Sequence, residues 1–312
     1  MTELTNSAIS EIDSKRLKFR QRVFDAGLLV PSGVDGVYGR SAVFEAIVAG
    51  LASSVNRCAA ADGAESYRFP PVVTRSNYVK SDHLRSFPQL TGSIHSFTGT
   101  DRDHLEVMKQ VDAGENWSAH FTPTDIMLCP AACYPVYPML AGRLRPGGRV
   151  IETQTYVFRH EPSVDPMRLQ FFRQHEHIRI GDPNEVLAWR NTWFDRAHEL
   201  LTAWQLPFLA KVASDPFFGR GGKLMAKSQV EQALKFEMNV PIMGEDHPTA
   251  CVSLNLHHDH FSHTFGIESS TGGVVHTSCI GFGLERLTLG LLRFHGLDVN
   301  DWPTAVRSEL GV

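Results

Sequence analysis

Two cysteines four residues apart are the first residues of this sequence that suggest chemistry. Cys129 and Cys133 lie in the apolar, proline-rich stretch CPAACYPVYP (129–138). A thiolate is a good zinc ligand, but a free cysteine also packs in a core as a small apolar residue. The chain has five cysteines, and this odd number, with no visible export signal, argues against a disulfide framework. Metal binding, catalysis and packing remain as alternatives.

A second group of functional residue types follows one expected strand. If residues 168–180 (RLQFFRQHEHIRI) form a strand, alternate side chains share one face at about 7 Å spacing. That face contains Arg168, Gln170, Phe172, Gln174 and Glu176. Arg159 and Glu161 reach the same end of the hairpin across the loop EPSVDP. Because guanidinium groups bind phosphate and an aromatic ring stacks on a base, the hairpin suggests a nucleotide site; the alternative is a solvated hairpin with incidental ion pairs.

A further arginine lies at the start of an expected helix. In CIGFGLERL (279–287), Gly281 and Gly283 allow a close backbone approach, and Arg286 falls in the first turn. A positive charge is unfavourable at that end of the helix dipole. A bound phosphate would therefore explain Arg286 better than packing does.

A histidine-rich segment, HHDHFSHT (257–264), is a weaker candidate for a metal site. As a strand it would spread its histidines over both faces, with no Glu or Cys at a paired offset. The histidines are His257, His258, His260 and His263. We disfavour metal binding here.

The elements that must position these residues are helices followed by many strands. Helices are expected over residues 11–27 and 41–61, with Val43 on the buried face of the second, and a strand begins within 69–75. This order indicates an α+β fold, in which helices flank an antiparallel sheet. A later helix begins at Gly283.

The longest helix is expected between residues 182 and 204. Asp182 caps its start, Glu185 completes a capping box, and one apolar stripe faces the core. The stripe consists of Val186, Trp189, Trp193, Ala197, Leu200, Leu201 and Trp204.

Composition limits the function further. The net charge is -4 and the pI is near 6.4, with no basic run, so the chain lacks the charge pattern of a protein that grips a long nucleic acid. No stretch of about 18 uncharged apolar residues suggests a membrane span, and we expect a soluble, cytoplasmic protein. Without a visible repeat or linker, residues 1–312 are expected to form a single catalytic domain.

These pieces together resemble a known family. FPPVVTRSNYVKSDHLRSFPQL is similar to motif 1 of the class II aminoacyl-tRNA synthetases of the seryl type, VFRHE with RLQFFRQHE to motif 2, and GFGLER to motif 3. PAACYPVYP, SDPFFGR and LKFEMNVP narrow the resemblance to the amino acid:[carrier protein] ligases, which are truncated seryl-synthetase-like proteins. The resemblance implies a homodimer that joins through motif 1. It also implies that the enzyme makes an aminoacyl adenylate and charges the phosphopantetheine thiol of a carrier protein.

The resemblance implies site residues as well. It implies that Cys133, Glu176 and Cys279 are zinc ligands and that the zinc keeps an open position for the amino group of the substrate. It implies that ATP is bound by Arg159, Glu161, Phe172 (adenine) and Arg286 (γ-phosphate), with Arg168 as a weaker phosphate candidate. Arg159 and Arg286 would be the catalytic residues.

Two assignments stay open within the resemblance. Seryl enzymes carry a Mg²⁺-binding Glu where this chain has PTACVSLN, so the Mg²⁺ ligands are open, with Glu237 as one candidate. The other cysteines, Cys58, Cys129 and Cys251, are expected to be packing residues.

The acceptor and the amino acid are expectations of the same kind. No sustained heptads of a tRNA-gripping coiled coil precede motif 1, so tRNA is not the expected acceptor. Arg220, Lys223 and Lys227 are candidates for docking an acidic carrier protein, unless they form an ordinary solvated helix face. Glycine is the expected amino acid, alanine the second choice, and serine is not excluded.

Other classes of function remain as alternatives. The chain could be a seryl-type paralogue that is non-catalytic and regulatory, or one that charges tRNA. It could also be a zinc hydrolase that activates water at Cys133, Glu176 and Cys279. The hydrolase reading leaves Phe172 and the phosphate-seeking arginines without a role.

Overall fold

A seven-stranded sheet forms the centre of the structure. The structure is a computed structural model, and it describes residues 10–312 apart from the side chain of Arg220. In spatial order the strands are β10 (Leu209–Val212), β11 (Lys235–Val240), β12 (Thr249–His258), β14 (His276–Gly283), β9 (Phe171–Gly181), β8 (Arg149–Phe158) and β3 (Glu65–Tyr67). Neighbours are antiparallel, except that β3 runs parallel to β8. The predicted α+β fold is confirmed, and the parallel β3–β8 pair in this sheet was not predicted.

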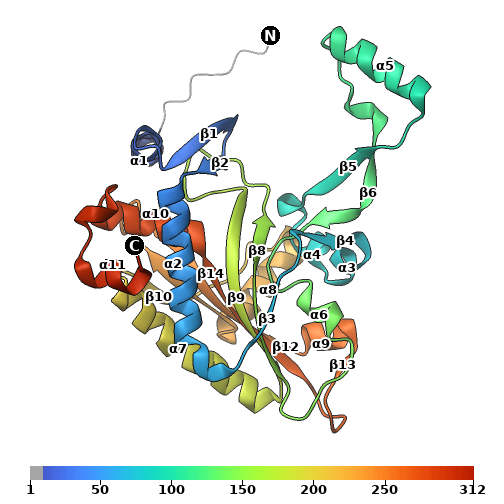
Figure 1. Cartoon of the computed structure of the whole chain (residues 1–312). Helices are drawn as coiled ribbons and strands as arrows, with labels where there is room; N and C mark the ends of the chain where they lie inside the picture. The colour runs from blue at the N-terminus through green and yellow to red at the C-terminus, as the bar shows by residue number, and fades with distance from the viewer. Residues whose placement is uncertain (1–9) are drawn as a thin grey trace.

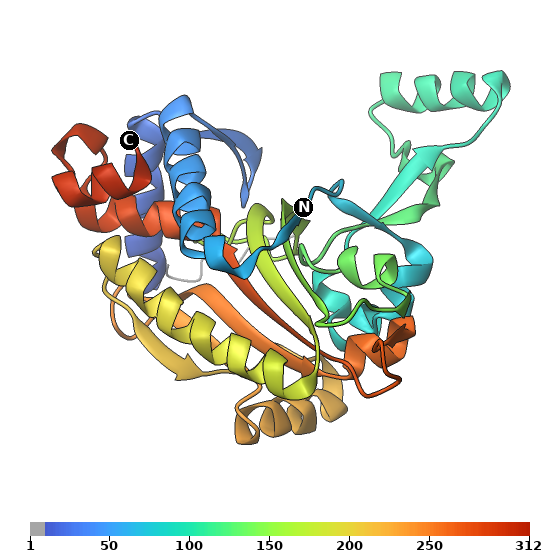
Figure 2. The same ribbon diagram turned by 60° about the horizontal axis from the view of Figure 1, so that its bottom comes forward.

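Helices cover one face of this sheet, and Figure 2 shows the longest of them, α7, lying along it. These helices are α2 (Ala42–Cys58), α7 (Pro183–Ala203), α10 (Leu284–His295) and α11 (Thr304–Leu310). The core between the helices and the sheet is apolar and aromatic. Trp193 of α7 and Phe282 of β14, for example, are fully buried within it.

The predicted amino-terminal helices are confirmed as α1 (Glu11–Asp25) and α2. The hairpin of β1 (Leu29–Val34) and β2 (Val37–Arg40) connects them. The buried stripe of α2 was wrong at one position: Val43 is 47% exposed and Phe44 is buried instead.

The start of α7 differs in one detail from the expectation. Asp182 caps the helix, since its Oδ1 accepts from the N–H groups of Asn184 (2.8 Å) and Glu185 (3.3 Å). The carboxylate of Glu185, however, bonds to Arg179 of β9 at 2.5 Å. The expected capping box is therefore replaced by an ion pair that ties the helix to the sheet.

An arm extends away from the sheet in both views (Figures 1 and 2). Its strands are β4 (Val72–Thr74), β5 (Ser93–Phe97) and β6 (Phe121–Leu128), and α5 (Asp101–Asp112) lies at its end. The strand predicted within residues 69–75 is thus β4, and Arg75 already begins α3 (Arg75–Lys80).

The remaining α-helices and strands lie outside the central sheet and the helices on its α7 face. They are α4 (His83–Ser86), α6 (Val136–Met139), α8 (Gly219–Glu231), α9 (His260–Phe265) and the paired short strands β7 (Gly142–Arg143) and β13 (Ile267–Glu268). Among the described residues, none of the helices has both the length and the apolar character that a membrane span requires.

Candidate active site

A cavity of about 790 Å³ lies on the face of the sheet opposite α7. Strand alternation divides β9 between the two faces. His177 packs on Trp193 of α7, with ring centroids 4.9 Å apart, whereas Gln174 and Glu176 line the cavity. Gln174 and Glu176 of β9 are therefore directed into the cavity, and His177 lies on the opposite face of the sheet.

The structure brings most of the predicted site residues into this cavity. Its lining includes Cys133, Arg159, Phe172, Glu176, Cys279 and Arg286. Arg168 and Glu161 are outside the lining and pair with each other at 3.1 Å. The predicted strand begins late, at Phe171, so Arg168 and Gln170 do not share the face of Phe172. Gln170 instead donates to the carbonyl of Asp35 at 2.7 Å.

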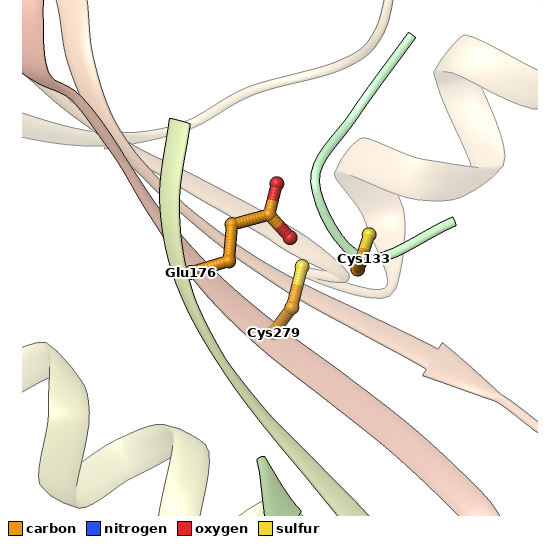
Figure 3. Close-up of side chains that lie close together, drawn as sticks. All are labelled: Cys133, Glu176 and Cys279. Carbon is orange, nitrogen blue, oxygen red and sulfur yellow. The ribbon is translucent and has the colours of Figure 1, made fainter. Parts of the chain in front are cut away.

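Cys133, Glu176 and Cys279 form a compact group in this cavity (Figure 3). They come from the turn before α6, from β9 and from β14, and their ligand atoms all lie within 4.8 Å of one another. Each side chain is buried, and the Oε2 of Glu176 has no hydrogen-bond partner among the described residues. Two thiolates and a carboxylate suit Zn²⁺, and three protein ligands leave a position open.

The electrostatics of this group favour a bound cation. Burial, together with the charge of Cys279, raises the pKa of Glu176 to about 8. A hydrogen bond between the cysteines raises the pKa of Cys133 and lowers that of Cys279. A Cys279 thiolate therefore opposes the ionisation of Cys133 and Glu176, and a divalent cation between the three groups would remove that opposition.

Arg286, Arg159 and Phe172 form a second group in the cavity, with Phe172 nearer than Glu176 to the start of β9. Arg286 donates from Nε to the carbonyl of Met167 and from Nη1 to that of Ala250, both at 3.0 Å. The guanidinium carbons of both arginines lie 5.5 Å from the centroid of the Phe172 ring. Two positive charges beside an aromatic ring, one of them held in place by backbone carbonyls, suit a nucleotide phosphate chain.

A buried ion cluster that sequence reasoning missed also lines the cavity. Lys235 is 8% exposed, and its Nζ lies 2.5 Å from Asp215 Oδ1 and 3.0 Å from Glu237 Oε1. Burial alone would raise the pKa of Asp215, but the Lys235 ammonium lowers it below its ordinary value. The same ammonium makes Glu237 a poor Mg²⁺ ligand, which counts against that candidate. Strand alternation in LKFEMNV was the signal, since it places Lys235 on the face of Glu237.

The remaining cysteine and histidine expectations have mixed outcomes. Cys129 is fully buried against Val73, Tyr78 and Met127, so its assignment to packing is confirmed. The histidine-rich segment is not a continuous strand, because residues 260–265 form α9. His257 nevertheless lines the cavity, a position that the sequence did not indicate.

The fold is that of the class II aminoacyl-tRNA synthetases. M. kandleri SerRS, solved in complex with A. aeolicus tRNASec, superposes with a TM-score of 0.80 at 18% identity, over 99% of this chain and 62% of that one. The cytoplasmic serine-tRNA ligase of Naegleria fowleri in complex with AMP gives a TM-score of 0.70 at 13% identity, over 94% of this chain and 65% of that one. This chain therefore spans less than two thirds of either synthetase.

Sequence comparison narrows the class to a family. Amino acid–[acyl-carrier-protein] ligase 1 of Bradyrhizobium diazoefficiens is 43% identical over 282 residues, which cover 90% of this chain and 86% of that protein. Amino acid–[acyl-carrier-protein] ligase 2 of the same organism is 41% identical, over 90% of this chain and 84% of that protein. The chain belongs to the amino acid–[acyl-carrier-protein] ligase family.

More distant relatives are type-2 serine–tRNA ligases. A type-2 serine–tRNA ligase of Methanococcus aeolicus is 29% identical over 195 residues, which cover 59% of this chain and 37% of that protein. No model in the scan of protein families matches the chain.

Proposed function

We propose that this protein activates glycine, with alanine as the second choice, as an aminoacyl adenylate and transfers it to the phosphopantetheine thiol of a carrier protein. The observation that carries the proposal is the shared cavity. It holds the Cys133, Glu176 and Cys279 group and, farther along, Arg159 and Arg286 beside Phe172. A substrate with an amino group at one end and a carboxylate at the other would span the two groups.

The amino end of the substrate would be held at the cysteine–glutamate group. A bound zinc ion would supply an open coordination position for the amino nitrogen. Cys133, Glu176 and Cys279 would hold that ion, since their donor types and burial fit it. The carboxylate would then point toward the arginines.

The carboxylate end would react with ATP. One carboxylate oxygen attacks the α-phosphorus in line, a new O–P bond forms, and the bond to pyrophosphate breaks. Arg159 and Arg286 would stabilise the charge that develops on the phosphate oxygens, and Phe172 would contact adenine. Mg²⁺ would bind through the phosphates. Transfer follows when the carrier thiol attacks the carbonyl carbon and AMP leaves.

Helix α8 is the proposed docking surface for the carrier. Lys223 and Lys227 are exposed on it, and Leu224 between them is 72% exposed. Gly221, Gly222 and Met225 of the same helix line the cavity, so a partner on α8 would be beside the reaction centre. An acidic carrier with an apolar contact patch would fit this surface. A homodimer through the motif 1 region is part of the same proposal.

Aminoacylation of a carrier tests the proposal directly. Labelled glycine, ATP and zinc-loaded enzyme should label a phosphopantetheinylated carrier protein, and neither the same carrier without phosphopantetheine nor bulk tRNA should be labelled. Labelling of tRNA in place of the carrier would contradict the proposed acceptor.

A further inference from the structure

His257 lies next to the metal group without belonging to it. Its Nε2 is 3.8 Å from the Sγ of Cys279, and its Nδ1 is 3.1 Å from the hydroxyl of Thr277. The ring of Phe261 meets it edge-on, with centroids 4.9 Å apart, and Tyr137 does the same at 6.2 Å. Hydrogen bonding and packing therefore fix the orientation of the imidazole.

A β-bulge in β12 places this ring. Asn255 is paired with Cys279 on β14, but the ladder then shifts so that His258 is opposite Thr277, which leaves His257 as the extra residue. His258 has a φ of 50°, in the left-handed region that residues other than glycine rarely adopt. Bulges are common beside active sites, where they re-aim a side chain.

We infer that His257 is a positioning residue for the metal group and that His257 donates its Nε2–H to the sulfur of Cys279. This inference rests on the proposed zinc site. A metal-bound thiolate has no proton to give, so the imidazole must be the donor of this contact. In a neutral ring Nδ1 then accepts from the Thr277 hydroxyl, and this hydrogen bond selects the tautomer.

Asn255 supplies a second donor to the same sulfur. Its Nδ2 lies 3.6 Å from the Sγ of Cys279. Both donors come from β12, which is the strand next to the one that carries Cys279. N–H groups directed at a thiolate withdraw charge from it, oppose its reprotonation and fix its direction toward the metal. A metal so held is more electron-poor, which suits an open position that must accept an amine.

Cobalt substitution tests this role without an activity assay. In Co²⁺-loaded protein the sulfur-to-metal charge-transfer band reports the electron density on sulfur. His257→Leu removes the N–H donor, and Thr277→Val removes the hydroxyl that selects the tautomer. Both variants should move the band to longer wavelength, and zinc affinity, measured by chelator competition, should fall by about tenfold or more in His257→Leu.

Matched variants complete the experiment. His263→Gln changes an exposed histidine of the same segment and should leave the band and the affinity unchanged. His257→Gln keeps an amide N–H and should recover most of the wild-type band position. Should His257→Leu fail to fold, Thr277→Val alone still decides between a shifted and an unshifted band.

The possible failures are distinguishable. A wild-type protein that binds neither zinc nor cobalt would overturn both the proposed metal site and the role of His257. Metal-loaded His257→Leu and Thr277→Val with wild-type spectra and affinity would overturn the role of His257 alone. An imidazole ligand to the metal, seen by X-ray absorption, would also contradict it, because His257 would then be a ligand.

Discussion

The guanidinium carbon of Arg286 lies 5.5 Å from the centre of the Phe172 ring. Arg159 approaches the same ring at the same distance, and only 3% of Phe172 is exposed. An adenine ring can therefore stack on Phe172 only after neighbouring groups move. Arg286 is held by two backbone carbonyls, so we expect Arg159 to move when ATP binds.

Replacement of Arg286 tests this arrangement. Arg286→Gln should lower the rate of ATP–pyrophosphate exchange by about 100-fold or more, because a fixed positive charge is lost where negative charge develops. Arg293→Gln, an exposed arginine in the last turn of the same helix, is the matched control and should keep the wild-type rate. A fully active Arg286→Gln enzyme would remove the residue from the catalytic group.

The cysteines make different predictions for metal content. Cys133→Ser and Cys279→Ser should each lower bound zinc from about one ion per chain to less than about a tenth, as elemental analysis would measure. Cys129→Ala should keep its zinc and lose only stability, by about 1 kcal/mol, because Cys129 is a packing residue. Zinc loss in Cys129→Ala with retention in Cys133→Ser would reverse the assignment.

Two buried histidines predict acid sensitivity of the fold. Burial lowers the pKa of His175 and His177 to about 3, from an ordinary value of 6.5. Both are neutral in the folded protein, so their stabilising contribution is complete above pH 6.5 and is lost as the pH falls toward 3. At pH 5.5 each should cost about 1.4 kcal/mol of unfolding free energy.

A variant at His177 isolates this effect. Its ring packs on Trp193, and neither ring nitrogen has a hydrogen-bond partner among the described residues, so phenylalanine can replace it. In urea unfolding, His177→Phe should lose less stability between pH 7.5 and 5.5 than the wild type, by about 1.4 kcal/mol. His247→Gln, at an exposed histidine, should lose as much stability as the wild type between these two pH values. Equal losses in all three proteins would show that His177 does not cause the sensitivity.

Charge reversal on α8 separates carrier docking from adenylation. The triple variant Arg220→Glu, Lys223→Glu and Lys227→Glu should lower transfer to an acidic carrier at least about tenfold and leave ATP–pyrophosphate exchange within about twofold of wild type. Lys109→Glu on α5 is a control at a similarly exposed lysine. Unchanged transfer in the triple variant would remove α8 as the docking surface.

The fold and the metal group were accessible from the sequence for different reasons. Apolar periodicity predicted α2 and α7 because each buries one stripe against the sheet. Cys133, Glu176 and Cys279 are far apart in the chain, and only the family resemblance linked them. Pairing of β9 with β14 brings Glu176 and Cys279 together in the structure.

The errors have local physical causes. The face predicted for Arg168 required a strand that begins at residue 168, whereas β9 begins at Phe171. Before that point, the backbone N–H and the side chain of Gln170 donate to the carbonyls of Gly36 and Asp35 in the β1–β2 hairpin. His257 was missed because a bulge breaks the alternation on which the prediction depended. Neither the hydrogen bonds of Gln170 nor the bulge in β12 leaves a signal in the residue pattern.

Amino-acid-dependent ATP–pyrophosphate exchange, run with each of the twenty amino acids on zinc-loaded and chelator-treated enzyme, tests the central claim most directly. The account predicts exchange with glycine, or with glycine and alanine, that is lost on chelation and restored by zinc. Zinc-loaded enzyme that supports no exchange with any amino acid would contradict the proposed adenylation and favour a binding or regulatory role.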